Sequence, residues 1–196
     1  VSEQADFGIS VDPDVDRLAL ICENGEPFVE EYTLVSVADY ILECAEAEGI
    51  GDLVTVSNLS SSRALRDVTE THGGKYYASA VGEVNVTTLM REKGAIIGGE
   101  GNGGVIYPAI HAGRDAMVGV ALFLSNLAHK KMKVSALKKT YPEYHIAKNR
   151  IELSFDYYVK TTKDVLTAVT LPPSLGFSTY MANLGEVENK GFEISA

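Results

Sequence analysis

The chain has 196 residues, which suits one domain of ordinary size, or one domain with parts of its neighbours. Its 45% hydrophobic and 22% charged residues are typical of a folded protein and exclude long disordered segments. The net charge of -10 and the lack of a basic stripe argue against a nucleic-acid partner. The longest apolar run, residues 116–124, is about half of a membrane span, so we expect no membrane segment.

Two features bear on the compartment and on the extent of the chain. Cys22 and Cys44 lie in apolar patterns without metal-binding spacing. This predicts buried free thiols in a reducing compartment, and we therefore expect a cytoplasmic protein. The chain begins at Val1, without a signal-peptide pattern, and enters a predicted strand almost at once. We expect it to be a piece of a longer protein.

The first two predicted elements frame an acidic loop. Residues 7–11 and 18–22 are short apolar runs that predict strands, and Asn24-Gly25 after the second run favours a tight turn. Residues 12–17 between the strands read DPDVDR. Three carboxylates therefore lie at every second position of a loop between strands, followed by an arginine.

Helices and strands alternate in the middle of the chain. A helix is predicted from Thr33, as its N-cap, to a stop at Gly49, because apolar residues recur between them at helical spacing. Strands are further predicted at 52–57, 75–80 and 95–99, and helices at 60–74 (capped by serine), 82–94, 113–130 and 134–141. This alternation predicts an α/β fold, a mostly parallel sheet with helices on both faces.

The last part of the chain has a different pattern. Residues 145–154 resemble a strand that leaves the domain. Residues 155–196 have weak periodicity and carry no motif that we can place, and the run LPPSLG at 171–176 breaks any regular element.

The acidic loop is a candidate metal site. Asp12, Asp14 and Asp16 can converge their oxygens on one hard cation, for which Mg²⁺ is the natural choice. An EF-hand would find an acid at its twelfth position in Glu23, but it needs glycine where this chain has Arg17. A guanidinium beside a bound cation suits a phosphoryl group, because both charges stabilise negative charge during transfer. The alternative is a polar turn without a ligand.

A glycine-rich segment, GGEGNGGVIYP at residues 98–108, is the second candidate site. It matches G-x-G-x-x-G, but no helix follows, which excludes a dinucleotide loop. Glu100 and Asn102 could present an acceptor and an amide to sugar hydroxyls, although a tight turn needs the same glycines. Downstream, Asp115 is expected to cap a helix, and Arg114 is expected to face the same cleft.

Together DPDVDR, VGEVNV at 81–86 and GGEGNGGVIYP resemble the α-D-phosphohexomutase superfamily, the phosphoglucomutases, phosphomannomutases and phosphoglucosamine mutases. The resemblance covers about residues 1–153. It implies the end of a second domain at 1–26, a third α/β/α domain at 27–150 and an unassigned segment at 151–196. Many relatives read Gly-Glu-x-Ser-Gly-His in the sugar loop, whereas this chain has Asn102 in place of the serine and Gly104 in place of the histidine.

The resemblance also implies the roles of individual residues. Asp12, Asp14 and Asp16 would hold Mg²⁺, and Arg17 would lie beside a phosphoserine as a catalytic residue. The substrate-binding residues would be Glu100, Asn102, Gly103 and Arg114. The substrate would be a hexose or hexosamine phosphate, with a hexose 1,6-bisphosphate as the intermediate.

The parts of the family that carry the phosphoserine and clamp the substrate phosphate have no counterpart motif in this sequence. We therefore expect this chain alone to be inactive and to work with the missing domains of its parent. Two alternatives stay open. One is a Mg²⁺-dependent phosphatase or phosphotransferase of the haloacid-dehalogenase type, in which a loop aspartate is the nucleophile. The other is a non-catalytic module that binds a sugar phosphate.

Overall fold

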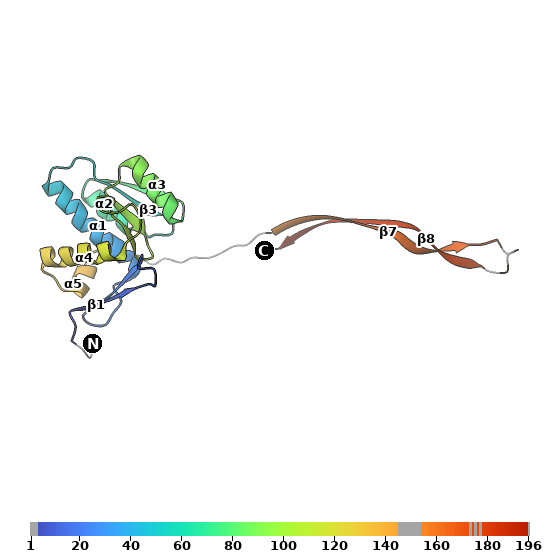
Figure 1. The fold of residues 1–196 in the computed structure, drawn as a ribbon, viewed down its shortest axis with the longest axis horizontal. Helices are drawn as coiled ribbons and strands as arrows, with labels where there is room; N and C mark the ends of the chain where they lie inside the picture. The colour runs from blue at the N-terminus through green and yellow to red at the C-terminus, as the bar shows by residue number, and fades with distance from the viewer. Residues whose placement is uncertain (1–3, 145–153, 173, 175, 177, 196) are drawn as a thin grey trace. The chain divides into compact units, whose positions relative to one another are not determined.

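The computed structural model describes residues 4–144, 154–172, 174, 176 and 178–195, and the chain forms two compact units that divide after residue 146 (Figure 1). In the first unit the strands are β1 (Phe7–Val11), β2 (Leu18–Cys22), β3 (Val54–Asn58), β4 (Lys75–Ser79), β5 (Ile97–Glu100) and β6 (Gly104–Ile106). Its helices are α1 (Glu30–Ala47), α2 (Ala64–Thr71), α3 (Glu83–Lys93), α4 (Ala116–Lys130) and α5 (Val134–Lys138).

The main sheet has the order β4-β3-β5-β6. The strands β4, β3 and β5 are parallel, and β6 pairs antiparallel with β5 at the edge. Helices cover both faces, so the predicted α/β class is confirmed. Val54 and Val56 of β3 pack under α3 with Ile106. The alternate residue Thr55 points to the opposite face, where its hydroxyl lies 2.7 Å from that of Thr69 in α2.

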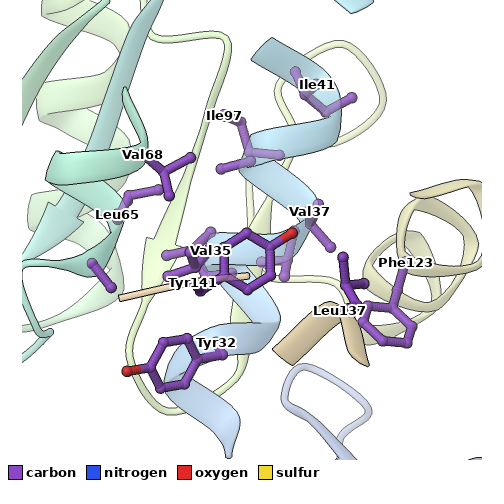
Figure 2. Close-up of a cluster of buried hydrophobic side chains, with 14 of the residues drawn as sticks. Tyr32, Val35, Val37, Ile41, Leu65, Val68, Ile97, Phe123, Leu137 and Tyr141 are labelled. Carbon is purple, nitrogen blue, oxygen red and sulfur yellow. The ribbon is translucent and has the colours of Figure 1, made fainter. Parts of the chain in front are cut away.

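The helix α1 is the centre of the larger core (Figure 2). It lies between α2, which contributes Leu65 and Val68, and α4, which contributes Phe123. Because it is covered on several sides, α1 is buried almost continuously from Glu31 to Ala38. Burying this many apolar side chains supplies most of the stability of the unit.

The beginning of α1 differs from the sequence prediction. The helix begins at Glu30, and Thr33 lies inside it, fully buried, with its hydroxyl donating to the carbonyl oxygen of Leu18 at 3.4 Å. A threonine can cap a helix or bond back to a nearby carbonyl, and here packing against β2 selects the second role. The predicted stop at Gly49 is confirmed, since this residue follows the helix with a φ of 74°.

The two strands predicted on either side of the acidic loop are confirmed as β1 and β2, and they pair antiparallel as a hairpin separate from the main sheet. The second unit is also a hairpin, of β7 (Ser154–Thr170) and β8 (Thr179–Ser195), which we did not predict from the sequence. The break predicted at 171–176 lies between these two strands. The strand predicted at 145–154 falls almost entirely outside the described residues. No helix in the described part of the chain is long and apolar enough to cross a membrane.

The two cysteines are both free. Cys22 is buried as predicted, and burial raises the pKa of its thiol, whereas Cys44 is only half-buried. A free, inert thiol in the core behaves as a small apolar side chain.

His72, directly after α2, joins this helix to α1. Its Nε2 lies 2.9 Å from Asp39 Oδ1, and its Nδ1 lies 2.9 Å from Glu46 Oε2. Burial disfavours the charged ring, but the two carboxylates outweigh it and raise the pKa of His72. Lys130 of α4 shares Asp39 at 3.6 Å. The protonated histidine therefore holds two helices together through both ring nitrogens.

We expect the stability of the chain to depend on pH through His72. Because its folded pKa is above the unfolded value of about 6.5, its contribution is complete below pH 6.5 and is lost as the pH rises through the folded pKa. The substitution His72→Gln should lower the free energy of unfolding in urea by about 1–2 kcal/mol at pH 5.5, and by less at pH 8.5. His111→Gln, in an exposed loop, is the control. Equal losses at both pH values would contradict this role.

Candidate functional site

The acidic loop closes on itself through Asp12. Its Oδ1 accepts hydrogen bonds from the backbone N–H groups of Asp16 and Arg17, both at 3.1 Å. Its Oδ2 accepts from Arg17 Nε at 2.6 Å. The loop turns at Val15, whose φ is 56°, and the carbonyl oxygen of Val15 accepts from the first N–H of α4, that of Ala116, at 3.1 Å. The N-terminus of a helix therefore fixes the far side of the loop.

The charges of the loop are balanced by two arginines. Partial burial opposes ionisation of Asp12, but the hydrogen bonds from Arg17 and Asp16 outweigh it and hold the pKa of Asp12 far below its usual range. Burial raises the pKa of Asp16, although Arg114 opposes this by pairing with it. Asp12 in turn raises the pKa of Arg17. The carboxylates of Asp12 and Asp16 are thus held in place by these partners, whereas Asp14 is exposed.

The three aspartates offer oxygens to a cation. One carboxylate oxygen from each of Asp12, Asp14 and Asp16 lies within 4.8 Å of the others. The Oδ1 atom of Asp16 is buried and accepts no hydrogen bond among the described residues, and Arg17 Nε lies 3.5 Å from it. A buried carboxylate oxygen without a donor fits a hard divalent ion. The residues present therefore suit Mg²⁺.

The EF-hand alternative does not fit the structure. Glu23, at the twelfth position, lies beyond β2 and accepts hydrogen bonds from the backbone and the hydroxyl of Ser135. The bonds to Ser135 lower the pKa of Glu23. Its carboxylate is therefore directed to the helix α5 and not to the acidic loop.

The glycine-rich loop, residues 101–103, connects β5 to β6 and contacts the acidic loop through the backbone. The N–H of Leu18, the residue after Arg17, donates to the carbonyl oxygen of Gly103 at 3.1 Å. Gly103 has a φ of 90°, and a Cβ there would overlap the carbonyl oxygen of Leu18. Only glycine permits this approach without strain. The loop that matches G-x-G-x-x-G therefore brings the backbone of the main sheet into close contact with that of the β1–β2 hairpin.

Glu100 is buried at the end of β5, with 4% of its surface exposed. Its Oε1 accepts from Asn58 Nδ2 at 2.6 Å, and its Oε2 accepts from Arg114 at 2.6 Å. Asn58 ends the parallel neighbour β3, so both side chains reach the carboxyl edge of the sheet, where α/β proteins place ligands. Asn102 is exposed, and its Oδ1 accepts from the N–H of Gly104 at 3.1 Å.

One groove brings the two candidate sites together. It has a volume of about 330 Å³ and is lined by Asp12 and Arg17 of the acidic loop and by Asn102 of the glycine-rich loop. A larger cavity of about 630 Å³, beside Glu23 and α4, contains none of the predicted site residues. The smaller groove is the one in which charged groups and an amide converge.

Two residues of this region were not predicted from the sequence. Asn58 donates a hydrogen bond to Glu100. In the sequence, only its position at the end of a predicted parallel strand could have indicated this role. Glu83 begins α3, and its Oε1 accepts from the backbone N–H of Arg114 at 2.9 Å. It lies inside the quoted motif VGEVNV, but an acid in the first turn of a helix usually interacts with that helix alone. The predicted cap Asp115 is confirmed, since it accepts from Met117 and Val118 at 2.9 and 3.0 Å.

Comparison with known proteins gives the same class of domain as the fold. Residues 30–144 match the model of the phosphoglucomutase/phosphomannomutase α/β/α domain III. A phosphoglucomutase/phosphomannomutase of Thermococcus kodakarensis is 35% identical over 152 residues, which are 78% of this chain and 32% of that protein. A probable phosphoglucosamine mutase of Methanopyrus kandleri is 31% identical over 148 residues, or 76% of this chain and 32% of that protein.

Solved structures share the fold. A phosphoglucomutase/phosphomannomutase family protein from Burkholderia thailandensis superposes with a TM-score of 0.60 at 23% identity, covering 71% of this chain and 29% of that one. The Aspergillus fumigatus N-acetylphosphoglucosamine mutase, crystallised with GlcNAc-6P and magnesium, gives 0.59 at 14% identity, covering 80% and 35%. The first unit of this chain is an α/β/α domain with a preceding acidic hairpin. The chain belongs to the phosphoglucomutase/phosphomannomutase family, in the α-D-phosphohexomutase superfamily, and spans about a third of the length of its curated relatives.

We expect Gly103 to be required for the junction of the two loops. Gly103→Ala places a side chain against the Leu18 carbonyl at a positive φ, and should lower the free energy of unfolding by about 3 kcal/mol or more. Gly49→Ala is the matched control, because its φ is also positive but no atom lies within 4 Å of the new Cβ. That variant should lose only about 1 kcal/mol, the cost of the backbone conformation alone. Equal losses in urea denaturation would show that the contact with Leu18 is unimportant.

Proposed function

We propose that this chain is the part of a Mg²⁺-dependent phosphohexomutase that supplies the metal loop and the sugar loop. The reaction moves a phosphoryl group between the 1- and 6-positions of a hexose or hexosamine phosphate through a hexose 1,6-bisphosphate. The observation that carries this proposal is the junction at Leu18 and Gly103, which brings an acidic loop and a glycine-rich loop to one groove in a domain of this family.

In this proposal Asp12, Asp14 and Asp16 hold Mg²⁺. The ion supplies positive charge that neutralises phosphoryl oxygens during transfer. Arg17 is the catalytic residue, because 49% of its side chain is exposed in the groove while Asp12 fixes its Nε. Its remaining guanidinium N–H groups can donate to phosphoryl oxygens. The solved relatives from Aspergillus fumigatus support this ligand set, since one contains GlcNAc-6P and magnesium and another contains glucose 1,6-bisphosphate.

The sugar is recognised by the glycine-rich loop. Asn102 offers an exposed amide to the groove, and the backbone of Gly103 brings the loop within reach of Arg17 through Leu18. Glu100 lies behind them, with its carboxylate held by Asn58 and Arg114 so that its lone pairs keep one orientation. A fixed carboxylate beside an exposed amide suits the hydroxyl groups of a pyranose.

The transfer itself needs parts outside this chain. A serine that carries the phosphoryl group and a loop that clamps the substrate phosphate belong to the missing domains of the parent, which are the partners of this chain in the proposal. The isolated chain then binds ligands without turnover, in the cytoplasm, where free thiols such as Cys22 persist. A standalone sugar-phosphate-binding module would bind in the same way. The parent reading frame separates the two readings, by showing whether a serine loop lies upstream.

We expect calorimetric titration of the chain with Mg²⁺ to show binding that strengthens at least tenfold with glucose 1,6-bisphosphate. Three carboxylates hold Mg²⁺ weakly, and a phosphate oxygen completes the shell. Asp14→Asn should weaken the binding of Mg²⁺ at least tenfold, because it removes a charged ligand without removing the pair of Asp12 and Arg17. Asp52→Asn, in the exposed segment before β3, is the control. A folded chain that binds no Mg²⁺ even with the bisphosphate would leave the acidic loop as a polar turn.

The phosphatase alternative makes a different prediction. It needs a loop carboxylate that is free to attack phosphorus, and Asp12 is not free, because its two oxygens accept hydrogen bonds from the backbone N–H and the Nε of Arg17. We therefore expect p-nitrophenyl phosphate incubated with the chain and Mg²⁺ to release phosphate no faster than the buffer does. Steady, Mg²⁺-dependent release that disappears when one of the loop aspartates, Asp12, Asp14 or Asp16, is replaced by asparagine would support the phosphatase and remove the need for a serine elsewhere.

A further inference from the structure

Arg114 links three carboxylates from three different segments. Its guanidinium pairs with Asp16 of the acidic loop, with Glu100 at the end of β5 at 2.6 Å, and with Glu83 of α3 at 3.4 Å. Its backbone N–H also donates to Glu83. Only 19% of the side chain is exposed. The guanidinium of arginine is planar, always charged and carries several donors, so it can bridge carboxylates in this way. The ammonium of lysine is a compact charge and is less suited to bridging three carboxylates.

The side chain reaches this position because residue 104 is glycine. A Cβ at Gly104 would overlap Arg114 Cδ, and it would lie 3.1 Å from Arg114 Cγ. The stem of Arg114 is held at its end by the three pairs, so it cannot move aside without breaking them. The position of Arg114 therefore depends on Gly104, because a side chain at residue 104 would occupy the space that the arginine fills.

We propose that Arg114 is a positioning residue that couples the metal loop to the sugar loop. This inference rests on the proposed function and deepens it. A cation bound by the aspartates would neutralise Asp16 and weaken its ion pair with Arg114. The guanidinium of Arg114 would then interact more strongly with Glu100 and Glu83. Glu100 then holds its orientation toward the sugar more firmly. By linkage, a sugar phosphate that engages Glu100 strengthens the binding of Mg²⁺ by the same factor.

The sequence suggested a different role, direct contact between Arg114 and the substrate. The two roles predict different binding energetics. A direct contact changes the affinity for the sugar phosphate equally with and without Mg²⁺. A positioning role changes the coupling factor, which is the ratio of the Mg²⁺ dissociation constants without and with saturating glucose 1,6-bisphosphate.

The test is a calorimetric measurement of this factor in the full chain and in Arg114→Gln, Arg114→Lys and Gly104→Ala. We expect Arg114→Gln to reduce the coupling factor at least fivefold. Gly104→Ala should reduce it similarly although the arginine is retained, and Arg114→Lys should restore part of it. Arg91→Gln, on the exposed side of α3, is the control and should match the unmodified chain. Circular dichroism and the melting temperature verify that each variant is folded.

Two results would overturn the inference, and they differ in what else they overturn. An unchanged coupling factor in Arg114→Gln and Gly104→Ala, with weaker sugar-phosphate binding in the former, would assign Arg114 to substrate contact and leave the proposed function intact. An unmodified chain that binds neither Mg²⁺ nor the bisphosphate would overturn the proposed function together with the inference.

Discussion

The site depends on one backbone contact, the hydrogen bond from the N–H of Leu18 to the carbonyl oxygen of Gly103. The acidic loop belongs to the hairpin of β1 and β2, and the glycine-rich loop belongs to the main sheet. Hairpins of two strands are marginally stable alone, so this hairpin needs the domain to fix its position. Leu18 does so twice, because its side chain is fully buried in the core while its N–H reaches Gly103.

Electrostatics then decides how the carboxylates coexist at this junction. Without compensating charges, the carboxylates of Asp12, Asp16, Glu83 and Glu100 would repel one another. Arg17 and Arg114 compensate them, one at the exposed rim and one in the interior. Removing one partner of a buried pair leaves an uncompensated charge, so the acidic residues and the arginines constrain each other. The same compensation means that a cation at the aspartates has to compete with an arginine.

Much of the fold could be predicted from the sequence because its helices are regular. The predicted helices at 60–74, 82–94 and 113–130 contain α2, α3 and α4, since each has an apolar stripe and a clear glycine or capping signal. Thr33 was wrongly predicted as the N-cap of α1 because of a tertiary contact. The first turn of α1 packs against β2, and the helix therefore begins one turn before Thr33. The three-residue strand β6 is too short to produce any pattern, and its glycine reads as loop.

The hairpin of β7 and β8 was missed for the opposite reason. Its strands are long but exposed along nearly their whole length, so no buried face imposes a hydrophobic period. Near its open end Tyr157 packs on Phe192, with ring centroids 5.0 Å apart, but this contact buries little of either strand. A periodicity argument detects burial rather than strands, and it fails where a strand has no core.

The candidate site divides along a similar line. The acidic loop and the glycine-rich loop were predictable because their chemistry is local in the sequence. The roles of Asn58, Glu83 and Arg114 could not be predicted in this way, because their partners lie far away in the sequence. Each of these contacts joins residues at least 30 positions apart, and only the pair of Arg114 with Glu100 is closer. Sequence patterns identify which side chains can bind a ligand or take part in catalysis. The fold determines which other side chains fix their orientation.

That arrangement has a consequence for binding. The bonds that fix the loops, from Leu18 to Gly103, from Ala116 to Val15 and from Asn58 to Glu100, all lie within the first unit. Their ordering cost is met when the unit folds, so a ligand that enters the groove keeps more of its contact energy. Under the mutase proposal, this part of the enzyme therefore contributes a preformed share of the affinity for metal and sugar phosphate, and the clamp for the substrate phosphate contributes the rest. Turnover depends on groups that other parts must bring to the same groove.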